Sequence, residues 1–297
     1  MNTEAETHFE IPVFDWVKDT PEHGFSIILD GVRNAGKSHA LGHICNLIKN
    51  KYKFNACILI SGTAGIQIDT FNYVQDNMKY EANDLESILS SIIGIQKEDL
   101  KQHKGDKTKC AKILILLDDV IASKTSRGSG IAFNKQLEEL FILGRHLNLH
   151  FFLLTQHLNS ISNKMKSNAD VICCLKTGSY TKKKYLLENF MYLGNDDKKF
   201  AQNYISKVWD RPYSMLVINQ HKIQHANSVS EFVYRYVAPS DDIPTFEMHP
   251  QNDNMVVDWL LKQKWVGGLS ITKLFFPSGP TVGITFKCSG LHNLSIL

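Results

Sequence analysis

The chain places two glycines, a lysine and a serine at the spacing of a phosphate-binding loop. In GVRNAGKS, residues 31–38, Gly31 is followed after four residues by Gly36, Lys37 and Ser38, the pattern G-x-x-x-x-G-K-[ST]. In such a loop the backbone amides surround phosphate oxygens, the lysine reaches the β- and γ-phosphates, and the serine hydroxyl binds Mg²⁺. The pattern therefore predicts a site for a nucleoside triphosphate. The predicted nucleotide-binding residues are Gly31, Val32, Arg33, Asn34, Ala35, Gly36, Lys37, Ser38 and His39.

Two adjacent aspartates end the most apolar run of the chain, KILILLDDV, residues 112–120. A carboxylate at the end of a neighbouring strand completes the Mg²⁺ site of a phosphate-binding loop, and Asp118 is predicted to supply it. Because side chains alternate along a strand, Asp119 is expected to point elsewhere and to orient or deprotonate the attacking water. A solvated turn with two acids is the alternative.

Gln156 and Arg145 are the remaining candidates for catalysis. Gln156 follows the apolar run FFLLT, where a glutamine can hydrogen-bond the γ-phosphate or its water and report its presence; the alternative is an ordinary polar loop residue. Arg145 ends a predicted helix, a position that the helix dipole favours in any case. Its functional interpretation is an arginine finger that reaches the nucleotide of a neighbouring subunit, which requires a ring-shaped oligomer.

Strands that alternate with helices are expected to position these residues. The apolar run at 25–29 predicts a strand that delivers Gly31, and the pattern at about 37–51 predicts the helix that follows the loop. Such alternation predicts an α/β fold, a mainly parallel sheet covered by helices. The other predicted strands are 56–61, 112–120, 149–155, 171–176 and 214–219, and the other predicted helices are about 83–101, 133–146, 183–191 and 198–208.

Composition excludes several classes of protein. The chain has 297 residues, of which 43% are apolar, enough for one large domain with a buried core and too many for a disordered protein. The net charge of +3 is small, so a nucleic-acid partner must be argued from local basic patches. The six cysteines are scattered without metal-binding spacing, which favours reduced thiols in an intracellular compartment. With no signal peptide or membrane-spanning segment, the chain is expected to be soluble and not secreted.

Three parts of the chain are distinguished by pattern. Residues 1–24 are an N-terminal segment, 25–238 carry the predicted domain, and 239–297 form a C-terminal appendage to which we assign no role. The change at 239 follows from a cluster of Pro, Asp and Asn residues and a tail with Gly and Pro.

Taken in order, the stretches GVRNAGKS, ILILLDD, GRHLNLH and FLLTQH resemble the HerA/FtsK-like class of P-loop ATPases. Within that class they are most similar to the DNA-packaging ATPases of poxviruses, of other large or medium-sized eukaryotic DNA viruses and of virophages. The resemblance spans about residues 25–219. It implies a RecA-like fold of the ASCE type, a homo-oligomeric ring, and ATP-driven translocation of double-stranded DNA into a preformed capsid.

The resemblance also implies roles for single residues. Lys37 and Ser38 take the phosphate-binding and Mg²⁺ roles of the loop, and Asp118 is the second Mg²⁺ ligand. Asp119 takes the catalytic-acid role, although many relatives carry the longer Glu at that position. Gln156 is the sensor, and Arg145 is the finger. Capsid or portal components are the implied partners, and the host-cell cytoplasm, the virus factory or the virion is the implied location.

Basic loops are the candidates for DNA contact. A packaging motor needs contacts to the DNA backbone and no reading of sequence. The loop ASKTSRGSG directly after the aspartates carries Lys124 and Arg127, which we select as DNA-contact candidates. KGDKTK at 104–109 and TKKKY at 181–185 are further candidates, and each run taken alone is also typical of a solvated surface.

Other functions remain open at this point. A HerA-like cellular or plasmid DNA pump would use the same chemistry. A P-loop small-molecule kinase would share the loop and the strand-end aspartate, but such enzymes tend to carry an arginine-rich lid, and here arginines are few and unclustered. A nucleotide-binding interaction protein without turnover would have no need of Asp119 and Gln156.

Overall fold

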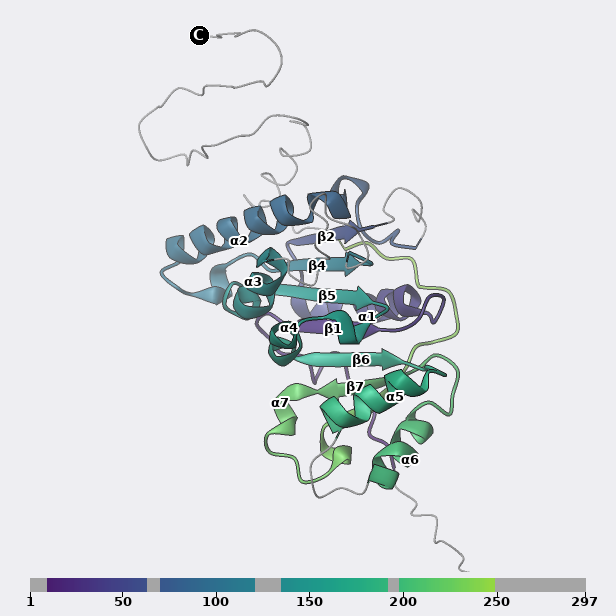
Figure 1. The fold of residues 1–297 in the computed structure, drawn as a ribbon. Helices are drawn as coiled ribbons and strands as arrows, with labels where there is room; N and C mark the ends of the chain where they lie inside the picture. Colours follow the sequence, from purple (N-terminus) through teal and green to yellow (C-terminus); the bar gives the residue numbers. More distant parts are fainter. Residues whose placement is uncertain (1–9, 63–69, 121–134, 192–197, 249–297) are drawn as a thin grey trace, which may run out of the picture.

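Eight strands form one sheet in the computed structural model of the chain, which describes residues 10–62, 70–120, 135–191 and 198–248 (Figure 1). Their order is β3-β2-β4-β5-β1-β6-β7-β8. Strands β1 to β6 run parallel to one another, and β7 is antiparallel to its two neighbours, β6 and β8. The strands are β1 (Ser26–Asp30), β2 (Ala56–Ser61), β3 (Lys79–Glu81), β4 (Ile113–Asp118), β5 (Leu149–Thr155), β6 (Val171–Leu175), β7 (Ser214–Asn219) and β8 (Val233–Val237).

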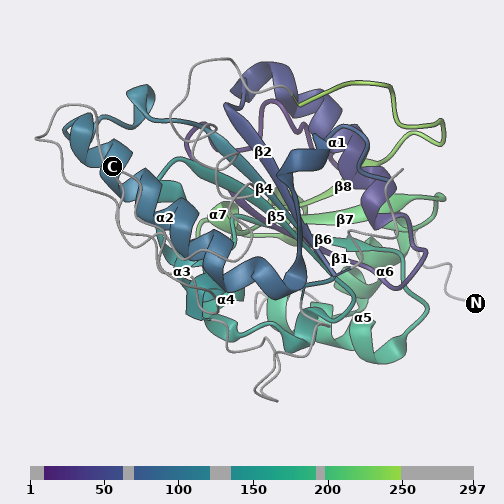
Figure 2. The same ribbon diagram turned by 90° about the horizontal axis from the view of Figure 1, so that it is seen from above.

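Helices cover both faces of this sheet, as predicted (Figures 1 and 2). One face carries α1, and the other carries α2 to α5. The apolar stripe of α1 is buried because it faces the sheet: Leu41, Ile44 and Ile48 have no exposed surface. The helices are α1 (Lys37–Tyr52), α2 (Leu85–Gln102), α3 (Lys135–Leu143), α4 (Asn163–Asn168), α5 (Tyr180–Leu186), α6 (Lys198–Val208) and the short α7 (Gln220–Ile223).

Strand β5 lies between β1 and β4, which is the order expected for the ASCE type. In this register Asp30 at the end of β1 is opposite Thr155 of β5, and Asp118 at the end of β4 is opposite Leu154. Because the three strands are parallel, their carboxyl ends share one edge of the sheet. That carboxyl edge carries the phosphate loop, the two aspartates and Gln156.

The described parts of both flanking segments pack on the central domain. In the N-terminal segment Phe14 and Trp16 are 2% and 1% exposed, and the Phe14 amide donates to the carbonyl of Arg235 in β8. In the C-terminal segment residues 239–248 cross α1, and Phe246 stacks on Tyr73 with ring centroids 4.9 Å apart. The body formed by 25–238 therefore includes core contacts from residues on either side of it.

The opposite, amino edge of the sheet contains a cluster of rings around His150 of β5. His150 has no exposed surface, and the rings of Phe25, Tyr52 and Phe54 lie with centroids 4.7 to 5.2 Å from its own. Neither of its ring nitrogens has a hydrogen-bond partner among the described residues. Burial lowers the pKa of His150 to about 3, so the ring is neutral and packs as an aromatic residue.

The structure also bears on the cysteines and on membrane-spanning segments. The cysteines at 45, 57, 110, 173 and 174 are buried free thiols, and Cys288 lies outside the described residues. In the described part of the chain no helix has the length and apolarity to cross a bilayer.

Candidate nucleotide-hydrolysis site

The phosphate loop leaves β1 at Gly31 and ends where α1 begins. Asn34 and Gly36 have positive φ angles of 61° and 91°, and such left-handed residues turn backbone amides toward one concave side. Gly36 adopts this conformation at little cost because it has no Cβ atom. The amino end of α1 adds its partial positive charge at the same place. The loop thus has the backbone geometry of an anion site.

Lys37 lies back across the start of the loop. Its Nζ donates to the carbonyl oxygens of Gly31 at 2.8 Å and Val32 at 3.2 Å. A Cβ atom built on Gly31 would lie 3.1 Å from Lys37 Cγ, so a larger residue at 31 would crowd the lysine. Burial lowers the pKa of Lys37, and the charges of three nearby aspartates oppose that shift. The amine is therefore held beside the loop by bonds that a phosphate can replace.

Asp118 is buried at the end of β4, with 5% of its surface exposed. Its Oδ2 accepts a hydrogen bond of 3.1 Å from the Ser61 hydroxyl. Burial, and secondarily the negative charge of Asp119, raise the pKa of Asp118 to about 6. A buried carboxylate beside a second carboxylate favours a cation, and Asp118 lies where the sequence places the Mg²⁺ ligand.

Asp119 and Gln156 contact each other directly. Gln156 Nε2 donates to both carboxylate oxygens of Asp119, at 3.1 and 2.9 Å. The expected strand 112–120 was too long, because β4 ends at Asp118 and Asp119 has a positive φ of 49°. A turn, and not the alternation of strand side chains, therefore sets the direction of Asp119. The predicted acid and the predicted sensor form one hydrogen-bonded unit.

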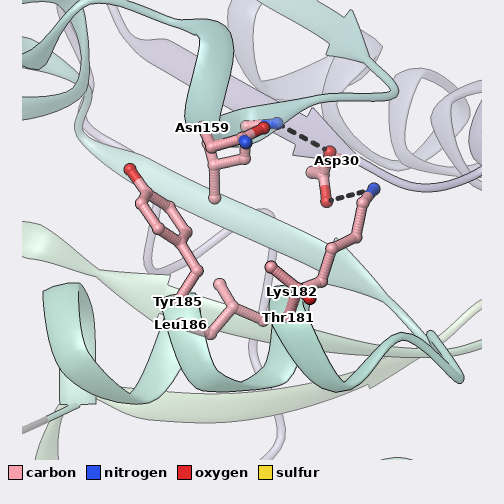
Figure 3. A pocket seen from close by; sticks show the side chains of 7 residues that line it. Asp30, Asn159, Thr181, Lys182, Tyr185 and Leu186 are labelled. Atoms are coloured by element: carbon pink, nitrogen blue, oxygen red, sulfur yellow. Dashed lines mark hydrogen bonds and ion pairs between the residues drawn. The ribbon is translucent and has the colours of Figure 1, made fainter.

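Asp30 and Lys182 form a further polar pair at this edge, which no local sequence motif indicates (Figure 3). Asp30 is 5% exposed, and its carboxylate accepts from the Leu158 amide at 3.1 Å and pairs with Lys182 Nζ at 3.4 Å. Burial raises the pKa of Asp30, while Lys182 and the Leu158 amide lower it. Lys182 also donates to the carbonyl oxygen of Gln156 at 2.6 Å. The start of α5 is thus tied both to β1, which leads into the phosphate loop, and to the backbone of Gln156.

The pair could have been suspected from one feature of the sequence. An aspartate directly before Gly31 at the end of an apolar run requires a cation or hydrogen-bond donors when it is buried. No local pattern says which of three consecutive lysines, 182 to 184, supplies the charge. Lys183 and Lys184 face a different cavity, between α5 and α6.

Comparison with known protein families decides the relationship of the chain. A family described as Poxvirus A32 protein matches residues 17–221, more than two thirds of the sequence. The chain belongs to the Poxvirus A32 protein family. The resemblance to the poxvirus DNA-packaging ATPases is thereby confirmed, and the protein is a P-loop ATPase of the viral genome-packaging class. No curated protein matches the chain.

Solved structures with the same fold have low sequence identity to this A32 family member. ATPases 2 and 3 of EssC from Geobacillus thermodenitrificans align with a TM-score of 0.50 and 12% identity, over 84% of this chain and 44% of that one. The cytoplasmic domain of the type VII secretion ATPase EccC from Thermomonospora curvata aligns with a TM-score of 0.50 and 14% identity, over 82% and 28%. B204, the DNA-packaging ATPase of Sulfolobus turreted icosahedral virus, aligns at 0.48 with 15% identity, over 74% and 98%. The first two establish the P-loop ATPase fold.

Arg145 lies away from the phosphate loop of its own subunit. It is exposed in the turn Gly144–His146, before β5, and so at the amino edge of the sheet, whereas Gln156 follows the other end of the same strand. The seven residues of β5 extend about 23 Å. The predicted helix 133–146 was too long at this end, since α3 ends at Leu143. Arg145 therefore has no place in the nucleotide site of its own subunit.

The basic runs of this A32 family member differ in their surroundings. Lys124 and Arg127 lie outside the described residues. Residues 104–109 precede β4 at the amino edge, where Lys107 Nζ donates to the Arg145 carbonyl and Lys109 pairs with Asp106. In the run 181–185 Lys182 faces inward to Asp30. Lys182 is thus a bridge within the domain and is not available for DNA.

Proposed function

We propose that the protein binds ATP with Mg²⁺ and couples its hydrolysis to the translocation of double-stranded DNA into a preformed viral capsid. Membership of the Poxvirus A32 protein family and the phosphate loop support this proposal. The observation that carries it is the contact of Gln156 with Asp119 beside that loop. A sensor bonded to a catalytic acid suits an enzyme whose hydrolysis must respond to a bound partner.

Ser38 and Asp118 would hold the Mg²⁺ ion. The described residues contain no cluster of three His, Cys, Asp or Glu side chains that could hold a metal by themselves. Mg²⁺ usually keeps several waters and is bound by one or two carboxylates together with substrate phosphates. The Asp118 carboxylate, placed at the same sheet edge as the phosphate loop, fits such a shared site. The ion would neutralise charge on the β- and γ-phosphates.

Asp119 and Gln156 would act on the attacking water. In this role the Asp119 carboxylate accepts the proton of the water. Gln156 occupies both oxygens of Asp119 in the structure, so a γ-phosphate that binds the Gln156 amide would free one oxygen for the water. The shorter reach of Asp119 relative to Glu suits a position fixed by its left-handed turn. Lys37 would move from the loop carbonyls to the phosphates.

Arg145 would serve a neighbouring nucleotide site. Its position at the amino edge fits a residue that reaches out of its own subunit, and a ring supplies a neighbour for each subunit. Double-stranded DNA would pass through the ring and contact loops such as the one with Lys124 and Arg127. Capsid or portal components would hold the ring during packaging in the host cytoplasm or virus factory.

The first experiment measures ATP hydrolysis by the full chain with and without linear double-stranded DNA. We expect DNA to stimulate hydrolysis and Lys37→Ala to abolish it. Size measurement on the same sample reports the assembly. Transfer of phosphate to a nucleoside, with no effect of DNA, would contradict the motor and favour a small-molecule kinase.

A mixing experiment tests the finger. Subunits with Lys37→Ala and subunits with Arg145→Ala are each expected to be inactive. If Arg145 acts on a neighbour, mixed rings contain sites with an intact lysine and an intact arginine, and hydrolysis returns. No recovery on mixing, or full activity of Arg145→Ala alone, would show that the assignment is wrong. Replacement of the exposed Arg211 by Ala is the matched control.

A further inference from the structure

Tyr213 lies directly beside the phosphate loop. It ends the connection between α6 and β7, and β7 is antiparallel to β6, so β7 starts at the carboxyl edge of the sheet. A Cβ atom built on Gly36 would lie 3.5 Å from Tyr213 Cδ1. The tyrosine ring therefore covers one side of the loop residue that precedes Lys37.

The conformation of Tyr213 is unusual for its size. Its φ is 55°, in the left-handed region that bulky residues rarely adopt. The residue is nevertheless 51% exposed, so burial of the ring does not account for this backbone. The Tyr213 carbonyl accepts from the Ala238 amide at 3.4 Å, which ties the turn to the end of β8. The fold thus presents an aromatic ring to solvent beside an anion site.

A second ring flanks the same position. His39 follows Ser38 in α1, and its ring centroid lies 6.2 Å from that of Tyr213. His39 Nε2 donates to the carbonyl oxygen of Pro239 at 2.8 Å, which fixes the ring against the segment that crosses α1. Two rings on separate elements thus lie side by side next to the loop.

The order of the strands sets the direction of a bound nucleotide. The aspartates and Gln156 lie on the β5 and β4 side of β1, while Tyr213 lies at the start of β7, on the β6 side. The γ-phosphate must face the acids, because hydrolysis takes place there. The rest of the nucleotide therefore extends from the loop toward the side of β1 on which Tyr213 lies.

We infer that Tyr213, with His39, forms the subsite for the base of the nucleoside triphosphate. The inference rests on the proposed function, since it requires a triphosphate in the loop 31–38. An aromatic face stacks on any nucleobase, and alanine substitution of such a ring weakens binding roughly 5- to 100-fold. Tyr213 thus separates nucleotides from other polyphosphates, while the loop binds the phosphates of both.

The test compares Mg²⁺-ATP with inorganic tripolyphosphate by calorimetry, using the full chain. Wild type is expected to bind ATP more tightly than tripolyphosphate. Tyr213→Ala should weaken ATP binding about tenfold and leave tripolyphosphate binding unchanged. Tyr213→Phe keeps the stacking face and should bind ATP as wild type does. Tyr213→Gly, which adopts a positive φ without strain, should lose ATP affinity as Ala does.

Matched measurements separate the possible failures. Tyr180→Ala removes a tyrosine that is 76% exposed on α5 and should change neither affinity. If wild type binds neither ligand, the proposed nucleotide site is wrong. If wild type binds both equally, or if Tyr213→Ala and Tyr213→Gly weaken both ligands alike, the base subsite is wrong while the phosphate site stands. Melting temperatures of all variants identify any that fail to fold.

Discussion

The two edges of the central sheet bury ionisable residues in different ways, although the same strands form both edges. At the carboxyl edge Asp30 and Asp118 are buried acids whose pKa values are raised, and Lys37 is a buried base whose pKa is lowered. At the amino edge His150 is buried among aromatic rings and is neutral. Strand β5 runs from the second environment to the first. At the carboxyl edge, ionisable residues are buried near one another although burial disfavours their charged forms. At the amino edge, the buried histidine is neutral.

The free-energy cost of burying charged carboxylates at the carboxyl edge suggests that this edge binds a ligand. Burial disfavours a charged carboxylate, and a second acid at Asp119 adds to the penalty. A fold selected for stability alone would place neutral groups there. Functional sites commonly carry such unfavourable groups, and replacement then stabilises the fold while activity is lost. The comparison therefore predicts that substitutions at the two edges have opposite signatures.

The largest expected effect is that of Asp118→Asn. Hydrolysis should fall roughly 100- to 1000-fold because the proposed Mg²⁺ ligand and its charge are lost. In EDTA without nucleotide the same variant should be more stable than wild type at pH 7. The folded pKa of about 6 lies above the ordinary value, so ionisation costs stability as pH rises, about 3 kcal/mol in full. Most of this gain should be lost by pH 4, where folded Asp118 is protonated and the aspartate of the unfolded chain is about half protonated.

Urea denaturation at pH 4 and pH 7 measures this difference, and Asp242→Asn, which changes an exposed acid, is the control. A variant that is destabilised at pH 7 would show that Asp118 stabilises the empty domain. The claim that buried charges at the carboxyl edge destabilise the empty domain would then be wrong.

Replacement of Gln156 by Ala should reduce the maximal hydrolysis rate roughly 10- to 100-fold and leave ATP affinity unchanged. The reason is that the bound γ-phosphate loses the amide proposed to orient it and the attacking water beside Asp119. Single-turnover hydrolysis with saturating ATP measures the rate. The exposed Gln202, changed to Ala, is the control. Normal turnover by Gln156→Ala would mean that the contact is only structural.

His150→Phe tests the amino edge. The folded pKa of about 3 lies below the ordinary value, so the unfolded chain takes up a proton that the folded chain rejects once the pH falls below 6.5. Between pH 7 and pH 5 the stability of His150→Phe relative to wild type should therefore rise by about 2 kcal/mol, because only wild type carries this proton-linked loss. Denaturation at both pH values measures it, with His225→Phe as the exposed control. If variant and wild type have the same pH dependence of stability, His150 is not the group responsible for the loss.

The smallest expected effect is that of Lys182→Met, which removes the charge but keeps most of the stem. The Gln156 carbonyl and Asp30 both lose their contact with this amine. We expect an approximately fivefold lower maximal rate with unchanged KM for ATP, equivalent to one hydrogen bond of about 1 kcal/mol. Lys183→Met, on the same helix, is the control. A change in KM with an unchanged rate would show that Lys182 acts on binding and not on the sensor.

Much of the carboxyl edge could be predicted from local sequence. The phosphate loop is continuous, and apolar runs that end in polar residues identify the strands: 56–61, 149–155 and 214–219 match β2, β5 and β7 residue for residue. Strand β8 was not predicted, because its alternating Tyr and Arg residues follow a polar stretch. It is a strand because β7 and the N-terminal segment bond to its two sides.

Contacts between distant residues were beyond the sequence patterns. Asp30 and Lys182 are 152 positions apart, and neither has a local motif that names the other. The bond between Asp119 and Gln156 depends on the left-handed conformation of Asp119, which the apolar run before it does not indicate. Arg145 was placed at the end of a helix, but that placement says nothing of its distance from the loop, which the direction of β5 decides.

Strand β5 has one further consequence. All seven of its residues are buried, and it joins the turn that carries Arg145 to Gln156, the proposed γ-phosphate sensor. In a ring in which Arg145 faces the next nucleotide, consecutive sites are connected in series through a stiff rod of about 23 Å. A displacement of Gln156 would then be transmitted along β5 to Arg145 and so to the next subunit, because no flexible linker lies between them. The order in which subunits hydrolyse ATP would then depend on the rigidity of this single strand.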